Sequence, residues 1–125
     1  MRIPIQELLA AYSEEIRLRI LLLLYHSEIC VNCLVAILDL PQSTISRHLS
    51  ILKKAGLIQS NRQGQHTYYT DRLSGNDIAH LNGKLLEDYS KNLMNQSPYN
   101  SDRLALIKQG HLCSVDCRVG IKENV

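Results

Sequence analysis

The stretch LPQSTISRHLSILKKAG, residues 40–56, decides the fold of this chain. Pro41 stands where a helix tolerates proline best, at its first position. Apolar side chains then recur at helical spacing, and Gly56 is typical of a helix end. The repeat consists of Ile45, Leu49 and Leu52 and gives the segment one buried stripe. We therefore predict an amphipathic helix over residues 42–54, with a polar side turned outward.

The sequence then changes its period. Residues 57–62 and 66–70 are rich in residues that favour strands, and Gln63 and Gly64 stand between them as a turn. A hairpin is therefore predicted directly after the helix. A second short helix is predicted just before it, over residues 30–38, so the whole unit has the pattern of a winged helix-turn-helix.

Helical spacing predicts further helices over residues 3–12, 13–25, 77–95 and 102–108. Ser13 is the expected N-cap of the second of these, because two acidic residues follow it. The chain has no Trp and no Phe, and 45% of its residues are hydrophobic. Its core must therefore consist mainly of Leu, Ile, Val and Ala, which favours helix packing over a β-sandwich.

The length of 125 residues suits one domain. The predicted fold is mainly α with a β-hairpin wing. Residues 1–97 form the predicted winged helix-turn-helix domain for DNA binding and dimerisation, and residues 98–125 form a C-terminal tail with a cysteine pair.

The outward side of the helix over residues 42–54 is small, polar and basic. Residues 40–70 include four basic residues and no acidic one, which suits a surface that meets phosphate. Gln can bond adenine, Arg can bond guanine, and hydroxyl groups serve bases or phosphates. Such a face could be merely solvated, but the basic hairpin beside it favours double-stranded DNA. The candidate DNA-binding residues are Gln42, Ser43, Thr44, Ser46, Arg47, His48, Lys53, Arg62, Gln63 and Gln65; alternatively, His48 braces the turn.

The sequence resembles the ArsR/SmtB family of metal-sensing repressors over about residues 1–95. The resemblance is carried by IRLRIL at residues 16–21, EICV at 28–31, LPQSTISRHL at 40–49, LKKAGL at 52–57 and the wing at 64–69. It implies a homodimer whose first and last long helices form the interface. It also implies a repressor that leaves its own operator when an effector binds. Symmetry implies an inverted repeat, with recognition helices about 34 to 36 Å apart.

Four cysteines occur as two close pairs, Cys30 with Cys33 and Cys113 with Cys117. In a reducing compartment such cysteines are more often ligands or redox groups than structural disulfides. The spacing of the first pair at a helix start places both sulfurs on one face, where the helix N-terminus stabilises thiolate. All four are candidate metal ligands, and the tail pair could serve its own chain or its partner's.

The arsenic-sensing branch of the family carries a motif similar to ELCVCD, where this chain has EICVNC at residues 28–33. Cys30 matches the first cysteine of that motif, Asn32 stands at the second position, and Cys33 follows one residue later. The resemblance favours arsenite or antimonite as effector. Soft thiolates also suit Cd(II), Pb(II) and Zn(II), and a disulfide switch that reports oxidants is a further alternative.

The chain has no apolar run long enough to cross a bilayer and no secretory stretch at its start, so we expect a cytoplasmic protein without a membrane partner. A thiol oxidoreductase is the rival from another class. Its CxxC motif normally lies in a βαβ unit, which is not predicted here, so we expect no enzyme activity and no enzymatic cofactor. A zinc-stabilised adaptor that uses the helix-turn-helix for protein contacts is a third alternative.

Overall fold

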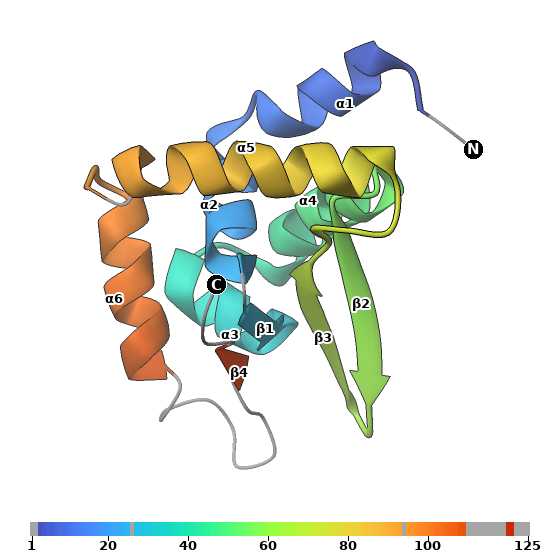
Figure 1. The fold of residues 1–125 in the computed structure, drawn as a ribbon. Helices are drawn as coiled ribbons and strands as arrows, with labels where there is room; N and C mark the ends of the chain where they lie inside the picture. Colours follow the sequence, from blue (N-terminus) through green and yellow to red (C-terminus); the bar gives the residue numbers. More distant parts are fainter. Residues whose placement is uncertain (1–2, 26, 94, 110–119, 122–125) are drawn as a thin grey trace.

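The computed structural model describes residues 3–25, 27–93, 95–109 and 120–121. The elements follow in the order α1 (Ile5–Tyr12), α2 (Glu15–Leu24), β1 (Ser27–Cys30), α3 (Val31–Leu38), α4 (Gln42–Lys54), β2 (Ile58–Gln63), β3 (His66–Asp71), α5 (Asp77–Leu93), α6 (Tyr99–Gln109) and β4 (Gly120–Ile121). In Figure 1, α1 and α5 lie across the top, the hairpin of β2 and β3 projects downward on the right, and α6 descends on the left. The chain is thus a winged helix-turn-helix that is mainly helical.

The hydrophobic core is built around α2, whose residues 20–24 are all buried. The predicted stripe of α4 packs into the same core, since Ile45, Leu49 and Leu52 are each at most 1% exposed. The helix itself has the predicted bounds. Burial of this stripe fixes which side of α4 faces outward, and the polar side is therefore presented to solvent.

The start of α2 differs from the prediction, because Ser13 is not its N-cap. Ser13 instead ends α1, and its hydroxyl donates to Ala10 O at 3.2 Å. Glu14 caps α2 and accepts a hydrogen bond from the backbone of Ile16 at 3.4 Å. Only two residues separate α1 from α2, so the first of them closes one helix and the second opens the next.

The hairpin is confirmed, but its turn lies one residue further on than predicted. Gln63 pairs with His66, so Gly64 and Gln65 form the turn. Gly64 has a φ of 63°, the left-handed conformation that two-residue hairpin turns require at their first central position. The sheet also has strands that the sequence did not predict, in the antiparallel order β2-β3-β1-β4. Strand β1 places Cys30 opposite Tyr68 of the wing.

Helix α6 is longer than the predicted segment of residues 102–108. It packs against α2 and α3. Asp102 accepts two hydrogen bonds from the Arg19 guanidinium, at 2.8 and 2.9 Å, and Leu106 is fully buried. The beginning of the tail is therefore joined to the core on the side of α3.

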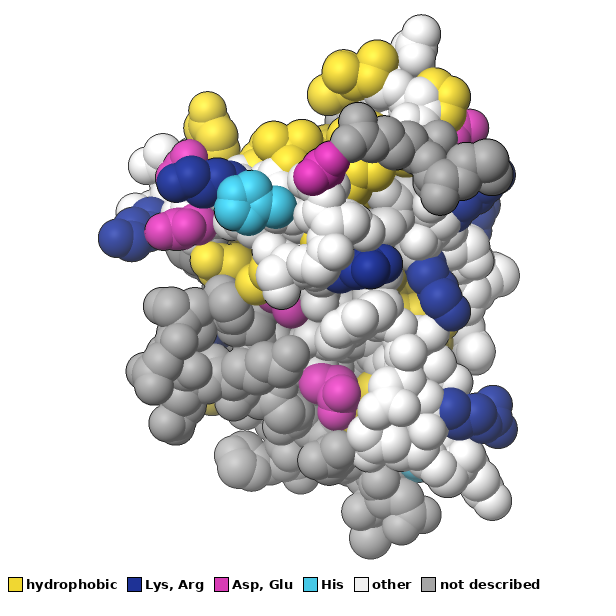
Figure 2. Space-filling view, turned by 45° about the vertical axis from the view of Figure 1, so that its right-hand side comes forward, with side chains coloured by type: hydrophobic (Ala, Val, Ile, Leu, Met, Phe, Trp, Pro, Cys, Tyr) yellow, Lys and Arg dark blue, Asp and Glu magenta, His cyan; other side chains and the backbone are white. Residues whose placement is uncertain are grey.

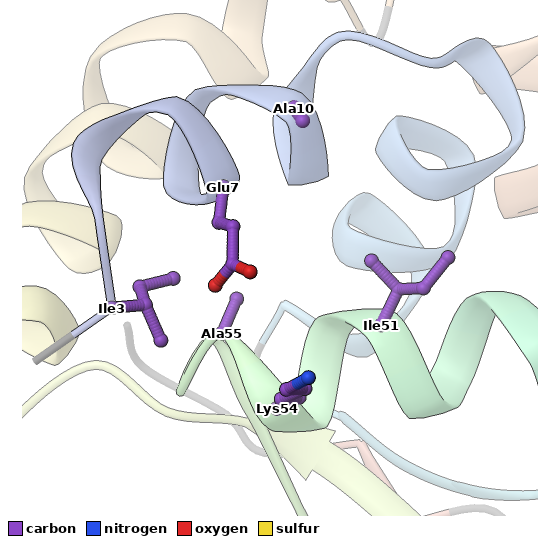
Figure 3. A pocket seen from close by; sticks show the side chains of 6 residues that line it. All are labelled: Ile3, Glu7, Ala10, Ile51, Lys54 and Ala55. Carbon is purple, nitrogen blue, oxygen red and sulfur yellow. The ribbon is translucent and has the colours of Figure 1, made fainter. Parts of the chain in front are cut away.

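Helix α1 covers the end of α4 incompletely. A cavity of about 210 Å³ separates them, lined by Ile3, Glu7 and Ala10 on the α1 side and by Ile51, Lys54 and Ala55 on the α4 side (Figure 3). Further apolar side chains are exposed on the outer sides of α1 and α5, namely Ile5, Leu9, Leu81 and Tyr89. Figure 2 shows exposed hydrophobic side chains in its upper part, at the height where α1 and α5 lie in Figure 1. Among the helices of the described ranges, none is long and apolar enough to cross a membrane.

Gly83 lets α5 approach the chain that leaves the wing. A Cβ at this position would lie 2.9 Å from Leu73 O. We expect Gly83→Ala to lower the free energy of unfolding by about 1 to 3 kcal/mol, because a backbone atom must shift. Helix propensity alone predicts a gain of about 1 kcal/mol, so the two effects have opposite signs. Urea unfolding measures the difference, with Lys84→Ala on the exposed side of α5 as a control; a more stable Gly83→Ala protein would contradict the close approach.

Candidate nucleic-acid interface and cysteine site

The candidate DNA-binding residues of α4 lie on its outward side, with one exception. Gln42, Ser43 and Arg47 are exposed, and Thr44 and Ser46 are half-buried. In the wing and at the end of α4, Lys53, Arg62 and Gln65 are exposed and Gln63 is half-buried. Figure 2 turns the wing side forward and shows Lys and Arg side chains along the right of a mainly uncharged polar surface. These residues thus form a polar, basic surface across α4 and the wing.

The exception is His48, which is 4% exposed and faces inward. Arg17 Nη1 lies 3.1 Å from His48 Nδ1, and Arg17 also donates to the backbone oxygens of Ala10 and Ala11 at 2.9 and 3.1 Å. Since a guanidinium can only donate, Nδ1 accepts and the ring is neutral. His48 therefore braces α4 against the end of α1. The sequence interpretation missed Arg17, because its partners come from other elements.

Burial lowers the pKa of His48 below its ordinary value of 6.5. Glu14, whose carboxylate lies 3.6 Å from Nδ1, raises the pKa, while Arg17 and Arg47 lower it further. The folded protein therefore binds fewer protons at this site than the unfolded chain as the pH falls below about 6.5. Stability contributed by neutral His48 is present above this pH and is lost in acid.

We therefore expect acid to destabilise His48→Gln less than it destabilises the parent, because the Gln amide oxygen can accept from Arg17 without titrating. Urea midpoints of the two proteins at pH 7.5, 6.5 and 5.5 measure this difference. His80→Gln, at an exposed position of α5, is the matched control and should follow the parent. An equal loss in parent and His48→Gln would show that another group causes the acid effect.

Lys53 connects the end of α4 to the wing. Its ammonium group donates to Ser60 Oγ of β2 at 2.7 Å. At the other end of α4, a cavity of about 160 Å³ lies between the start of α3, the start of α4 and the tip of the wing. It is lined by Cys30, Val31, Asn32, Gln42, Gln65, His66 and Thr67. Two candidate DNA-binding residues, Gln42 and Gln65, thus share one cavity with Cys30.

Cys30 ends β1 and caps α3, and its sulfur accepts from the backbone N–H of Cys33 at 3.4 Å. The two side chains are 1% and 0% exposed, and their sulfurs lie 3.4 Å apart. A disulfide needs about 2.05 Å, so they are not bonded to each other, although neither is a free thiol. The predicted convergence of these two sulfurs is therefore present.

The tail cysteines, Cys113 and Cys117, lie outside the described residues. Within the described ranges, no group of three or more His, Cys, Asp or Glu side chains is placed to hold a metal ion. Strand β4 pairs with β1, with Gly120 opposite Glu28 and Ile121 opposite Ser27. The C-terminal part of the chain therefore returns to the strand that ends at Cys30.

Comparison with known proteins first identifies a family model. Residues 14–60, from the start of α2 into β2, match the model described as "Bacterial regulatory protein, arsR family". The mycobacterial repressor SmtB of Mycobacterium tuberculosis is 41% identical over 75 residues, which span 60% of this chain and 54% of that protein. The arsenical resistance operon repressor of Escherichia coli is 43% identical over 68 residues, 54% of this chain and 57% of the relative. The chain thus matches a little over half the length of each of these two relatives.

Solved structures extend the match to most of a domain. HlyU from Vibrio cholerae is 33% identical, with a TM-score of 0.56, covering 67% of this chain and 89% of that one. A homodimeric winged helix-turn-helix DNA-binding domain from Mycobacterium bovis, described as a possible ArsR-family regulator, is 27% identical, with a TM-score of 0.57, covering 74% and 84%. The family model covers α2, β1, α3, α4 and the start of β2, which include the helix-turn-helix.

Proposed function

Because this chain belongs to the ArsR family of bacterial regulatory proteins, we propose that it is a cytoplasmic repressor that binds operator DNA as a homodimer and leaves it when a thiophilic effector binds its cysteines. The observation that carries the proposal is the cavity shared by Cys30, Gln42 and Gln65. A change in the position of the Cys30 sulfur would therefore reach Gln42 and Gln65, which lie on the surface proposed to meet DNA, across this one cavity.

In the proposed complex α4 enters the major groove of a DNA half-site. Gln42, Arg47 and the hydroxyl groups of Ser43, Thr44 and Ser46 face the base edges or nearby phosphates. Lys53, Arg62, Gln63 and Gln65 contact the sugar–phosphate backbone, which fixes position without reading sequence. His48 supports α4 from inside. The support for this arrangement is the exposed polar and basic surface of α4 and the wing.

The proposed homodimer buries the outer sides of α1 and α5. Ile5, Leu9, Leu81 and Tyr89 are between 51% and 66% exposed in the single chain. Large apolar side chains left exposed on two helices of one domain suit a protein–protein interface. The homodimeric relative from Mycobacterium bovis supports the same assembly. Two-fold symmetry would then present two copies of α4 to an inverted repeat.

The proposed effector site uses Cys30 and Cys33, joined by Cys113 and Cys117. Once both cysteines are reduced to thiolates, two sulfurs bound to one tetrahedral ion at about 2.3 Å would stand roughly 3.8 Å apart, close to the 3.4 Å between the sulfurs in the structure. Because Gly120 is paired with Glu28, three residues of chain are enough for Cys117 to reach this region. Soft thiolates prefer thiophilic ions, and the arsenical relative supports arsenite or antimonite. Cd(II), Pb(II) and Zn(II) are the alternative effectors.

The same cysteines support a second candidate function, a repressor that responds to oxidants. Neither Cys30 nor Cys33 is a free thiol in the structure. Thiolates are the form that binds soft ions, so an oxidised pair could not serve as ligands. An oxidant and a soft ion would therefore act on the same residues in different redox states.

A DNA-release titration tests the proposal. A duplex selected from a random pool by the full-length protein is labelled, and its anisotropy is followed at two salt concentrations. Binding that weakens with salt is expected, because Lys and Arg displace counterions. Arsenite, antimonite, Cd(II), Pb(II) and Zn(II) are then added under reducing conditions, and peroxide without reductant.

Release by arsenite or antimonite at the lowest concentration is the expected result. Release only by a divalent ion would replace the proposed effector, and release only by peroxide would favour the redox candidate. A protein that selects no duplex and unfolds with a chelator would be the zinc-stabilised adaptor instead.

A further inference from the structure

The buried amide of Asn82 joins α5 to both ends of the wing. Asn82 is fully buried. Its Nδ2 group donates to Leu57 O at 3.2 Å and to Arg72 O at 3.0 Å. Leu57 directly precedes β2 and Arg72 directly follows β3, so one side chain on α5 contacts the two points at which the hairpin leaves and rejoins the body of the protein.

These two points are also joined to each other, because the backbone N–H of Arg72 donates to Leu57 O at 3.0 Å. The next residue of α5, Gly83, brings the helix close to Leu73, which follows Arg72. The base of the wing is thus held at consecutive positions by α5. An apolar side chain at position 82 could fill the same space, but only a donor can fix the direction of both carbonyl groups.

The acceptor side of the amide is used as well. The Tyr12 hydroxyl of α1 donates to Asn82 Oδ1 at 2.7 Å. Burial raises the pKa of Tyr12 to about 12, so the hydroxyl remains a donor at any physiological pH. Helices α1 and α5, which carry the exposed apolar side chains Ile5, Leu9, Leu81 and Tyr89, are therefore linked through Asn82 to the base of the wing.

We propose that Asn82 is a positioning residue that sets the angle of the wing relative to α1 and α5, so that Arg62 reaches the DNA backbone when α4 is seated in the groove. The inference depends on the proposed DNA-binding function. Asn82 itself is fully buried and touches no DNA; it acts through Leu57 and Arg72.

A double-mutant cycle separates this role from a merely structural one. Operator affinity and its salt dependence are measured for the full-length parent, Asn82→Leu, Arg62→Ala and the double variant. Arg62→Ala should weaken binding several-fold and reduce the salt slope by about one. Asn82→Leu should have the same two effects, and the double variant should bind no more weakly than Arg62→Ala alone. When Asn82→Leu is combined with Arg47→Ala, the two losses of operator affinity should instead multiply.

Asn82→Leu may be replaced in the cycle by Tyr12→Phe if the first variant does not fold, as judged by circular dichroism and urea unfolding. Tyr12→Phe removes one hydroxyl and leaves the two carbonyl contacts, so a smaller effect in the same direction is expected. The inference would be overturned if the losses of operator affinity caused by Asn82→Leu (or Tyr12→Phe) and by Arg62→Ala multiply in the double variant. A parent protein that binds no duplex would instead overturn the proposed function, so the two failures are distinguishable.

Discussion

Cys30→Ser should raise the effector concentration needed for release by at least about 10- to 100-fold, while operator affinity stays nearly unchanged. Serine is a favoured N-cap, and its hydroxyl can accept from the backbone N–H of Cys33 as the sulfur does now. The start of α3 should therefore stay intact. The soft ligand, however, is lost. Replacing a partner outside the coordination sphere typically costs about 10- to 100-fold in metal affinity, so the loss of a ligand should cost at least as much.

The measurement is the effector concentration that releases half of the labelled operator, in reducing buffer, for parent and variant. Asn32→Ser is the matched control, because Asn32 is an exposed neighbour in the first turn of α3 and also lines the cavity with Gln42. It should release at the parent concentration. Equal release by Cys30→Ser and the parent would remove Cys30 from the effector site.

Arg47→Ala should give the largest loss of operator affinity among single changes on α4. Arg47 is exposed on the outward side, opposite the buried stripe of Ile45, Leu49 and Leu52. An Arg that bonds guanine through two hydrogen bonds contributes about 1 to 3 kcal/mol of discrimination. The variant should therefore bind the selected duplex more weakly and distinguish it less well from a scrambled one.

Anisotropy titrations with both duplexes at one ionic strength measure this effect. Arg103→Ala on α6 removes the same charge from the side of the molecule away from the wing (Figure 1), and it should change both affinities only slightly. Equal loss on selected and scrambled duplexes would mean that Arg47 contacts phosphate and reads no base.

Local patterns were sufficient to predict α4, because a proline start, an apolar repeat and a glycine end all lie within one short segment. The hairpin was predicted for the same reason, since its turn glycine and β-favouring residues are adjacent. Strand β1 was missed because its four residues, SEIC, show no alternation; its partner Tyr68 lies far along the chain. A helix near α6 was predicted, but its packing against α3 was not. The burial of Cys30 and Cys33 goes with these long-range contacts, which have no local signal.

Long-range polar contacts could not be predicted either. Asn82 reaches Leu57 and Tyr12, which are 25 and 70 positions away, and Arg17 reaches His48 across 31 positions. In the sequence each is one polar residue in a helical pattern. Only the packing of α1, α2, α4 and α5 brings the partners together.

Because β1 pairs with β3, a movement of Cys30 is passed directly to the wing at Tyr68. Cys30 is opposite Tyr68, which lies three residues, or roughly 10 Å, from the turn at Gln65. A strand cannot shift by one residue without exchanging its faces, so small displacements at Cys30 would tilt the hairpin and preserve its pairing. A tilt of about 10° would move the tip by roughly 2 Å, more than the few tenths of an ångström that a hydrogen bond tolerates.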